Sequence, residues 1–122
     1  MHVVITGGSS GIGLEVARIY ARRGAKISLI ARNQDRLNAA QRDIQSAAMG
    51  AAVFVHSADM ADAGQASRAI AACEAAHGAC DILVASAGVV EPGWFHEQTE
   101  QAWRAQLEIN FGGVVNAVHG VY

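Results

Sequence analysis

Short apolar runs alternate with stretches of helical periodicity along the chain, and most of them end at glycine or polar residues. The apolar runs predict strands over residues 3–6, 26–31, 52–57 and 81–85, because each is short and is bounded by turn-forming residues. The stretches between them predict helices over residues 12–23, 34–49 and 63–77. Thr99 is expected to cap a fourth helix, and a further apolar helix is expected over about residues 111–122.

Strands that alternate with helices indicate a parallel sheet, and right-handed crossovers then give the strand order 3-2-1-4. The predicted fold class is therefore α/β, a Rossmann-type doubly wound parallel sheet whose ligand binds between the first and fourth strands. Gly24 is expected to end the first helix as its C-cap. The apolar spacing predicts the inward faces: Ile12, Val16, Ile19 and Tyr20 in the first helix, Leu37, Ala40 and Ile44 in the second, and Trp103 and Leu107 in the fourth.

Composition narrows the class of protein. The 122 residues form one domain at most, 52% of them are hydrophobic, and the net charge of −2 gives no reason to expect a nucleic-acid partner. The five histidines pair with no cysteine at a metal-binding spacing, so no metal site is expected. Cys73 and Cys80 fit no redox pattern and are interpreted as reduced, buried small hydrophobes. No signal peptide and no run of about 20 apolar residues is present, which favours a cytoplasmic protein without a membrane segment.

The most informative segment is Thr-Gly-Gly-Ser-Ser-Gly-Ile-Gly at residues 6–13, between the first predicted strand and the first helix. A glycine loop that opens a helix can cradle phosphate, because backbone N–H groups and the helix dipole both favour an anion there. A structural βα turn is the alternative. The loop therefore suggests a dinucleotide site. The residues expected to contact this cofactor are Thr6, Gly7, Ser9, Ser10, Gly11, Ile12 and Gly13.

A basic residue marks the end of the second strand. Arg32 lies 19 residues beyond Gly13, close to the position where dinucleotide-binding folds carry an acid for the ribose of NAD. A guanidinium can instead fork onto the 2′-phosphate of NADP, so NADP(H) is the predicted cofactor. A solvated surface arginine is the alternative, and Asn33 and Arg36 are expected to add weaker contacts.

The glycine spacing T-G-x-x-x-G-x-G resembles the short-chain dehydrogenase/reductase family, in its shorter single-domain branch. The resemblance implies that Asp59, which follows the third strand beside Met60, accepts a hydrogen bond from the adenine amino group. The alternative is a helix cap, a role that Asp62 would serve as well.

Residues 85–88 read Ala-Ser-Ala-Gly where this family has Asn-Asn-Ala-Gly or a near variant. The retained pair Ala87 and Gly88 implies a backbone that passes close to the nicotinamide ribose. Ser86 can supply a hydroxyl, but Ala85 cannot replace an amide that ties neighbouring strands.

Asn110 matches the catalytic asparagine of the family, which helps to hold a water that passes protons to the catalytic lysine. The alternative is a local helix distortion in which the backbone satisfies the amide. The family's other groups, a serine and Tyr-x-x-x-Lys, lie downstream of this asparagine and are absent here, and Tyr122 does not match the tyrosine. Residues 1–122 are therefore expected to be the N-terminal, NADP-binding half of a truncated domain, inactive alone.

The function implied by the resemblance is NADP(H)-dependent interconversion of a ketone and a secondary alcohol, with a small-molecule carbonyl or alcohol substrate. The segments around the glycine loop and Arg32 are similar to 3-ketodihydrosphingosine reductases, which suggests a long-chain ketone. A homo-oligomer is expected for the full-length protein. A non-catalytic nucleotide-binding module is the alternative.

Overall fold

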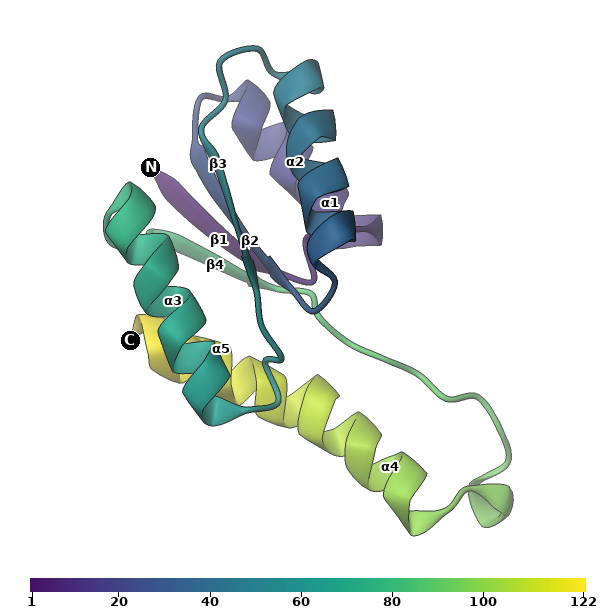
Figure 1. The fold of residues 1–122 in the computed structure, drawn as a ribbon. Helices are drawn as coiled ribbons and strands as arrows, with labels where there is room; N and C mark the ends of the chain where they lie inside the picture. Colours follow the sequence, from purple (N-terminus) through teal and green to yellow (C-terminus); the bar gives the residue numbers. More distant parts are fainter.

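The computed structural model describes all 122 residues and contains one four-stranded parallel sheet (Figure 1). Its strands are β1 (His2–Thr6), β2 (Lys26–Ala31), β3 (Val53–Ser57) and β4 (Ile82–Ala85). They lie in the order β3-β2-β1-β4, with every neighbouring pair parallel. The predicted α/β class and the strand order 3-2-1-4 are confirmed.

The helices are α1 (Gly11–Arg22), α2 (Gln34–Ala47), α3 (Ala63–His77), α4 (Glu100–Leu107) and α5 (Gly113–Val121). A 3-10 turn, Phe95–Glu97, precedes α4, and a π-helix, Glu108–Gly112, joins α4 to α5 in one continuous rod. Figure 1 shows α1 and α2 together on one side of the sheet and α3 and α5 on the other. The rod continues through α4 beyond the sheet, next to the long connection from β4.

The two faces of the sheet form two hydrophobic cores, because successive strand residues point to opposite faces. Val3 and Ile5 of β1 pack with α1 and α2, whereas Val4 packs with α3 and α5. All five residues of β1 are buried, as expected for a strand inside a doubly covered sheet. On the second face α5 approaches α3 closely, since a Cβ on Gly120 would stand 2.9 Å from a side-chain carbon of Ile70.

The buried face of α2 is the predicted one, Leu37, Ala40 and Ile44, but the predicted face of α1 is wrong for Ile12 and Ile19 and correct only in part for Val16 and Tyr20. The buried positions of α1 are Gly13, Ala17 and Ala21, whereas Ile12 is 79% exposed and Ile19 40% exposed. Small residues spaced four apart let the helix lie close to the sheet. The larger Leu14, Val16 and Tyr20 pack at the sides of this stripe and are only partly buried.

The predicted inner face of the fourth helix is also wrong, because Trp103 is 38% exposed and Leu107 is 56% exposed. The expected cap is correct: the Thr99 hydroxyl accepts from the amide of Ala102 at 3.1 Å. The element ends match the prediction or differ from it by one or two residues, and β2 and α3 match at both ends. The C-cap of α1 is Arg23, and Gly24 follows it with a φ of 83°.

The two cysteines are free and differ in burial. Cys73 is buried, and burial raises the pKa of its thiol to about 11, so it stays protonated at neutral pH. Cys80 is only half-buried, which corrects the prediction that both are buried.

A buried polar cluster lies at the amino-terminal ends of the strands, and nothing in the sequence analysis pointed to it. His2 is 2% exposed, and its Nδ1 lies 2.8 Å from the carbonyl oxygen of Gly78. Its Nε2 lies 2.8 Å from the hydroxyl of Ser28, which is also 3.3 Å from Nδ1 of His77. Nδ1 of His2 donates to the carbonyl, and in the neutral tautomer that this requires Nε2 is the acceptor for the Ser28 hydroxyl.

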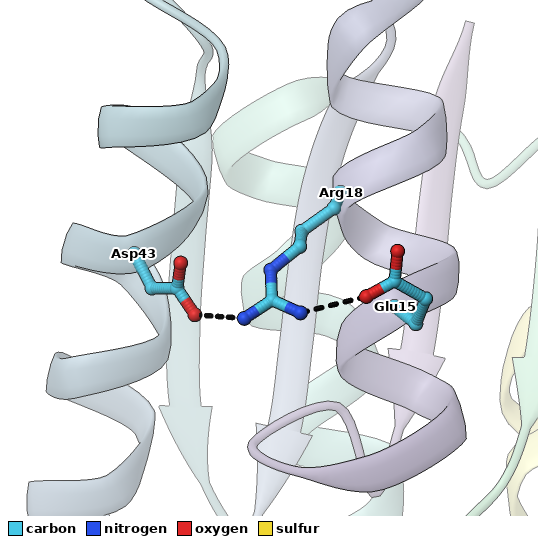
Figure 2. A network of polar contacts seen from close by, with 3 residues as sticks. All are labelled: Glu15, Arg18 and Asp43. Carbon is cyan, nitrogen blue, oxygen red and sulfur yellow. Dashed lines mark hydrogen bonds and ion pairs between the residues drawn. The ribbon is translucent and has the colours of Figure 1, made fainter.

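An ion-pair network joins α1 to α2 on the outside of the first face (Figure 2). Arg18 of α1 donates to Glu15 at 2.7 Å and reaches Asp43 of α2 with its other terminal nitrogen. The two carboxylates raise the pKa of the Arg18 guanidinium above its ordinary value. The network lies on the helix surface and reinforces the arrangement that core packing already sets. No helix in the structure has the length and apolar character needed to span a membrane.

Candidate functional site

A cavity of about 900 Å³ opens at the carboxyl-terminal ends of the strands, where the strand order changes direction between β1 and β4. This is the position at which doubly wound sheets bind ligands. Four chain segments and one helix residue form its walls. The segments are the glycine loop with the first turn of α1, the β2–α2 connection, the β3–α3 turn and the residues after β4, and the helix residue is Ile109.

The structure brings nearly all of the predicted cofactor-binding residues together in this cavity. Thr6 is 2% exposed and lies beneath the wall, and Asn110 is next to the lining residue Ile109 without lining the cavity itself. The predicted residues on the wall are Gly7, Ser9, Ser10, Gly11, Ile12, Gly13, Arg32, Asn33, Arg36, Asp59, Met60, Ser86, Ala87 and Gly88.

Two glycines of the loop are required by close backbone packing. Gly7 has a φ of 69°, and a Cβ placed on it would lie 2.6 Å from the amide nitrogen of Ala87. A Cβ on Gly13 would lie 2.4 Å from the Ser86 hydroxyl oxygen and 2.6 Å from the carbonyl oxygen of Gly7. The loop and the first turn of α1 therefore pack directly against the residues after β4, as tight helix–strand packing in dinucleotide folds requires.

The first turn of α1 faces the cavity with hydrogen-bond donors available to a ligand. Ser10 is the N-cap, yet its hydroxyl makes no capping bond to the helix. The first N–H groups of a helix have no partner within the helix, and the helix dipole favours an anion at this end. A diphosphate fits this arrangement, because Gly11 has nothing within 4 Å of where its Cβ would be.

The charge at the end of β2 is positive. Arg32 and Arg36 both line the cavity, and neither takes part in the ion pairs of the chain. Asn33 lies between them and caps α2, its side-chain oxygen accepting from the amide of Arg36 at 3.0 Å. No carboxylate occupies the end of β2, so a phosphate monoester there would meet two free guanidinium groups.

Asp59 is not the cap of α3. Asp62 has that role, since its carboxylate accepts from the amide of Gln65 at 2.9 Å. One oxygen of Asp59 accepts from the amide of Ala61 at 3.0 Å, which holds the carboxylate within the β3–α3 turn on the cavity wall. The other carboxylate oxygen has no partner within the chain and is available to a donor in the cavity.

The residues after β4 are tied to β1 by Ser86. Its hydroxyl donates to the carbonyl oxygen of Thr6 at 2.6 Å, beside a backbone bond between the same two residues at 3.1 Å. The hydroxyl thereby joins neighbouring strands, a role that the sequence analysis could not assign after the loss of the family's asparagines.

Asn110 lies within the π-helix and binds the backbone of Val89 with both ends of its amide. Its Nδ2 donates to the carbonyl of Val89 and its Oδ1 accepts from the amide of Val89, each at 2.7 Å. Val89 lines the cavity next to Gly88, so the asparagine fixes one of the cavity walls. Helix distortion and backbone partners are the features of the alternative interpretation, and the catalytic role of Asn110 stays a prediction.

Asn116 is a site residue that sequence reasoning missed. Its Nδ2 donates to the carbonyl oxygen of Met60 at 2.8 Å, and Met60 lines the cavity in the β3–α3 turn. The criterion that singled out Asn110, a polar amide within an apolar helix, applies equally to Asn116 between Val115 and Ala117.

Comparison with known proteins shows the family. The short chain dehydrogenase family model matches residues 1–122, and the chain belongs to this family. It is 37% identical over 117 residues to a 3-dehydrosphinganine reductase of Arabidopsis thaliana, an alignment that covers 96% of this chain and 34% of the relative. It is 35% identical over 117 residues to 2,3-dihydro-2,3-dihydroxybenzoate dehydrogenase of Bacillus subtilis, covering 96% of this chain and 44% of that one.

Solved structures agree in fold. An NADPH-bound short chain oxidoreductase of Pseudomonas aeruginosa, described as having an atypical catalytic center, superposes with a TM-score of 0.93 at 36% identity. The alignment covers 98% of this chain and 47% of that one. An actinorhodin polyketide ketoreductase with NADPH gives the same TM-score at 28% identity, covering 98% and 45% of the two chains. The chain thus spans between a third and a half of the length of these relatives.

Proposed function

We propose that this chain is the cofactor-binding part of an NADP(H)-dependent oxidoreductase that interconverts a ketone and a secondary alcohol. Family membership and relatives that are dehydrogenases and reductases support an oxidoreductase. Their greater length supports the interpretation of residues 1–122 as the N-terminal half of a single catalytic domain.

One observation carries the choice of NADP(H) over NAD(H). Arg32 and Arg36 stand free of ion pairs in the same cavity as the glycine loop, and the residues directly after β2 are Arg32 and Asn33, without a carboxylate. Asp35, in the first turn of α2, does not line the cavity. An acid at this position would accept from an unmodified ribose and repel a 2′-phosphate, whereas two guanidinium groups bind the phosphate. The NADPH in the similar Pseudomonas structure supports the same choice.

Different residues of the cavity wall would bind different parts of the cofactor. The N–H groups of the glycine loop would bind the diphosphate, Arg32 and Arg36 the 2′-phosphate, and Asp59 the adenine amino group. The backbone of residues 86–88 would lie along the nicotinamide ribose. The bound nicotinamide supplies the hydride, while the protein holds the ring where a carbonyl can approach it.

For the substrate we propose a small-molecule ketone or alcohol, with a long-chain 3-ketosphinganine-like ketone as the first candidate. The candidate rests on 37% identity both to the 3-dehydrosphinganine reductase of Arabidopsis thaliana and to a 3-ketodihydrosphingosine reductase of Mus musculus. A cytoplasmic location and a homo-oligomeric full-length protein complete the proposal.

A non-catalytic nucleotide-binding module is the second candidate, and the side chains that line the cavity are compatible with both candidates. The titratable side chains on the cavity wall are Arg32, Arg36 and Asp59, so no tyrosine, lysine, histidine or cysteine stands beside the predicted nicotinamide position. Reduction of a ketone needs a proton donor at the carbonyl oxygen.

The two candidates are separated by binding and turnover measured together. We expect NADPH to bind and to quench tryptophan fluorescence or shift a calorimetric titration. Ketone reduction is expected only when residues 1–122 are part of a catalytic domain that contains Tyr-x-x-x-Lys. If such a domain binds NADPH and reduces no ketone in a panel that includes 3-ketosphinganine, the binding-module candidate is correct.

A further inference from the structure

We propose that Asn116 is a positioning residue for the adenine end of the cofactor. Its amide holds the carbonyl of Met60 and thereby sets the place of the Asp59 carboxylate on the cavity wall. This inference rests on the proposed NADP(H) function and goes beyond it, because Asn116 does not line the cavity.

The β3–α3 turn at residues 58–62 is the wall that Asn116 supports. Backbone hydrogen bonds hold its two ends, from the Ala58 amide to the carbonyl of Ala31 at 2.9 Å and from the Asp62 amide to the carbonyl of Asp59 at 3.1 Å. Between them the Asp59 amide donates to Oε1 of Gln65 at 2.9 Å, and the Ala61 amide donates to the Asp59 carboxylate at 3.0 Å. The carbonyl of Met60, between these two amides, points away to α5 and accepts from Asn116 at 2.8 Å. The orientation of the Asp59 carboxylate therefore depends on a backbone that α5 holds from behind.

The packing of α5 makes this contact specific. Gly113, one turn before Asn116, is buried, and a Cβ on it would lie 3.7 Å from the Cβ of Met60. Met60 is 6% exposed and belongs to the same hydrophobic core as Ala117, the residue after Asn116. If the amide of Asn116 is removed, the half-buried carbonyl of Met60 must find another hydrogen-bond donor, or the backbone at Met60 must shift.

The same helical rod contacts two of the four segments that line the cavity. Asn110 binds the backbone of Val89 beside the expected nicotinamide ribose, and Asn116, six residues later, binds Met60 beside the expected adenine. One continuous helical element thus hydrogen-bonds to both of these segments. Asn110 serves the wall near the chemistry, and Asn116 serves the wall that recognises the base.

A cofactor analogue isolates this role. Asp59 would accept from the exocyclic amino group of adenine, and hypoxanthine has a carbonyl oxygen in its place. The ratio of affinities for NADP⁺ and its hypoxanthine analogue therefore reports whether the Asp59 carboxylate is correctly placed. One hydrogen bond of ordinary strength corresponds to a ratio of about 3–10.

The experiment measures Kd for both nucleotides with the 122-residue chain and three variants. Wild type is expected to prefer NADP⁺ by about 3–10-fold, and Asp59→Ala should abolish the preference. Asn116→Leu, which keeps the shape and removes the amide, should reduce it below about 2-fold. The matched control is His119→Leu, an exposed position on the same helix, which should keep the wild-type ratio.

Amide hydrogen exchange provides a readout that needs no ligand. Asn116→Leu should speed amide exchange at Asp59 and Ala61 about 3–10-fold and leave exchange in the glycine loop unchanged. Asn116→Gln, which keeps an amide, should restore part of the protection. If the leucine variant does not fold, Asn116→Ala takes its place.

The possible failures are distinguishable. Unchanged preference and unchanged exchange in Asn116→Leu overturn the inference and leave the proposed function intact, as does a wild-type chain that binds both nucleotides equally. If the wild type binds neither nucleotide, the proposed function fails. In that case the positioning role is tested by exchange alone, and it is overturned if Asn116→Leu exchanges at the same rates as the wild type.

Discussion

Single residues determine the charge and the shape of the cavity. Arg32 and Arg36 provide positive charge at one end, Asp59 provides a carboxylate beside it, and the wall contains no other ionisable side chain. Gly7 and Gly13 provide shape, because any side chain there would meet the backbone after β4 or the Ser86 hydroxyl. The proposed recognition of the cofactor therefore depends on a few positions that can be changed one at a time.

Arg32→Asp should reverse the cofactor preference. The substitution removes a charge-assisted hydrogen-bond donor and places a carboxylate where the 2′-phosphate would bind. NADPH affinity should fall by about 1.5–3 kcal/mol, roughly 10- to 150-fold, while NADH affinity is kept or improved. Titration of both reduced cofactors against the variant measures this. Arg42→Asp, an exposed change on α2 away from the cavity, is the control. Equal affinity of the wild type for the two cofactors would refute the assignment of Arg32.

Gly13→Ala should destabilise the protein and weaken cofactor binding. The added methyl group would stand 2.4 Å from the Ser86 oxygen and 2.6 Å from a backbone carbonyl, so the loop or β4 must move. Overpacking of this kind costs about 1–3 kcal/mol, measurable as a lower urea midpoint. Gly112→Ala is the matched control, because no atom lies within 4 Å of its Cβ position and alanine favours a helix. A Gly13 variant as stable as the control would show that the close approach is absent.

At the scale of elements, the alternation of short apolar runs with stretches of helical periodicity was enough to predict the sheet and its strand order. It did not predict which residues of every helix are buried. The α2 face follows the large apolar residues, whereas α1 buries Gly13, Ala17 and Ala21 and leaves Ile12 exposed. A helix face is predicted from the spacing of its large apolar side chains, so the pattern does not reveal a helix that packs through glycine and alanine. The π-helix and the second asparagine contact were also not predicted, because both depend on tertiary partners.

The buried polar cluster at the amino-terminal ends of the strands is expected to make the stability of the protein depend on pH. Burial, then the neighbouring His2 and Lys26, lower the pKa of His77 in the folded state below its ordinary value of 6.5. The neutral form is favoured on folding, so its contribution to stability is complete above pH 6.5 and is lost as the pH falls through the folded-state pKa.

We therefore expect His77→Phe to flatten the fall in unfolding free energy between pH 7.5 and about pH 5, measured by urea denaturation. The exposed His119→Gln should keep the wild-type pH profile. A His77→Phe profile parallel to that of the wild type would contradict this account.

At the scale of the whole molecule, the chain has a formed cofactor cavity and a large uncovered apolar surface. The continuous rod of α4, the π-helix and α5, with the residue that follows it, carries large apolar side chains at a helical spacing that are partly or fully exposed. They are Trp103, Leu107, Phe111, Val115, Val118 and Tyr122. Relatives that are two to three times longer have further chain available to cover such a surface, consistent with the proposal that residues 1–122 are one half of a domain.

We expect these 122 residues alone to oxidise no NADPH in the presence of any ketone. A positioned proton donor contributes about 10²–10⁴-fold to such a reaction, and no group of this kind lines the cavity. Absorbance at the nicotinamide band measures the rate, and retained NADPH binding shows that the chain is folded. Turnover above the buffer rate that a substitution within residues 1–122 abolishes would point to a catalytic group not described above.

The central claim, that NADP(H) binds across the carboxyl-terminal ends of the strands, is tested most directly by NMR titration of the labelled chain with NADP⁺. The account predicts shifts confined to the amides of the cavity wall, around residues 7–13, 32–36, 59–61 and 86–89, with smaller shifts for NAD⁺ at the same concentration. Amides of His2, His77 and Gly78, at the opposite end of the sheet, should not move. Shifts centred on that opposite end, or no shifts with either nucleotide, would contradict the account.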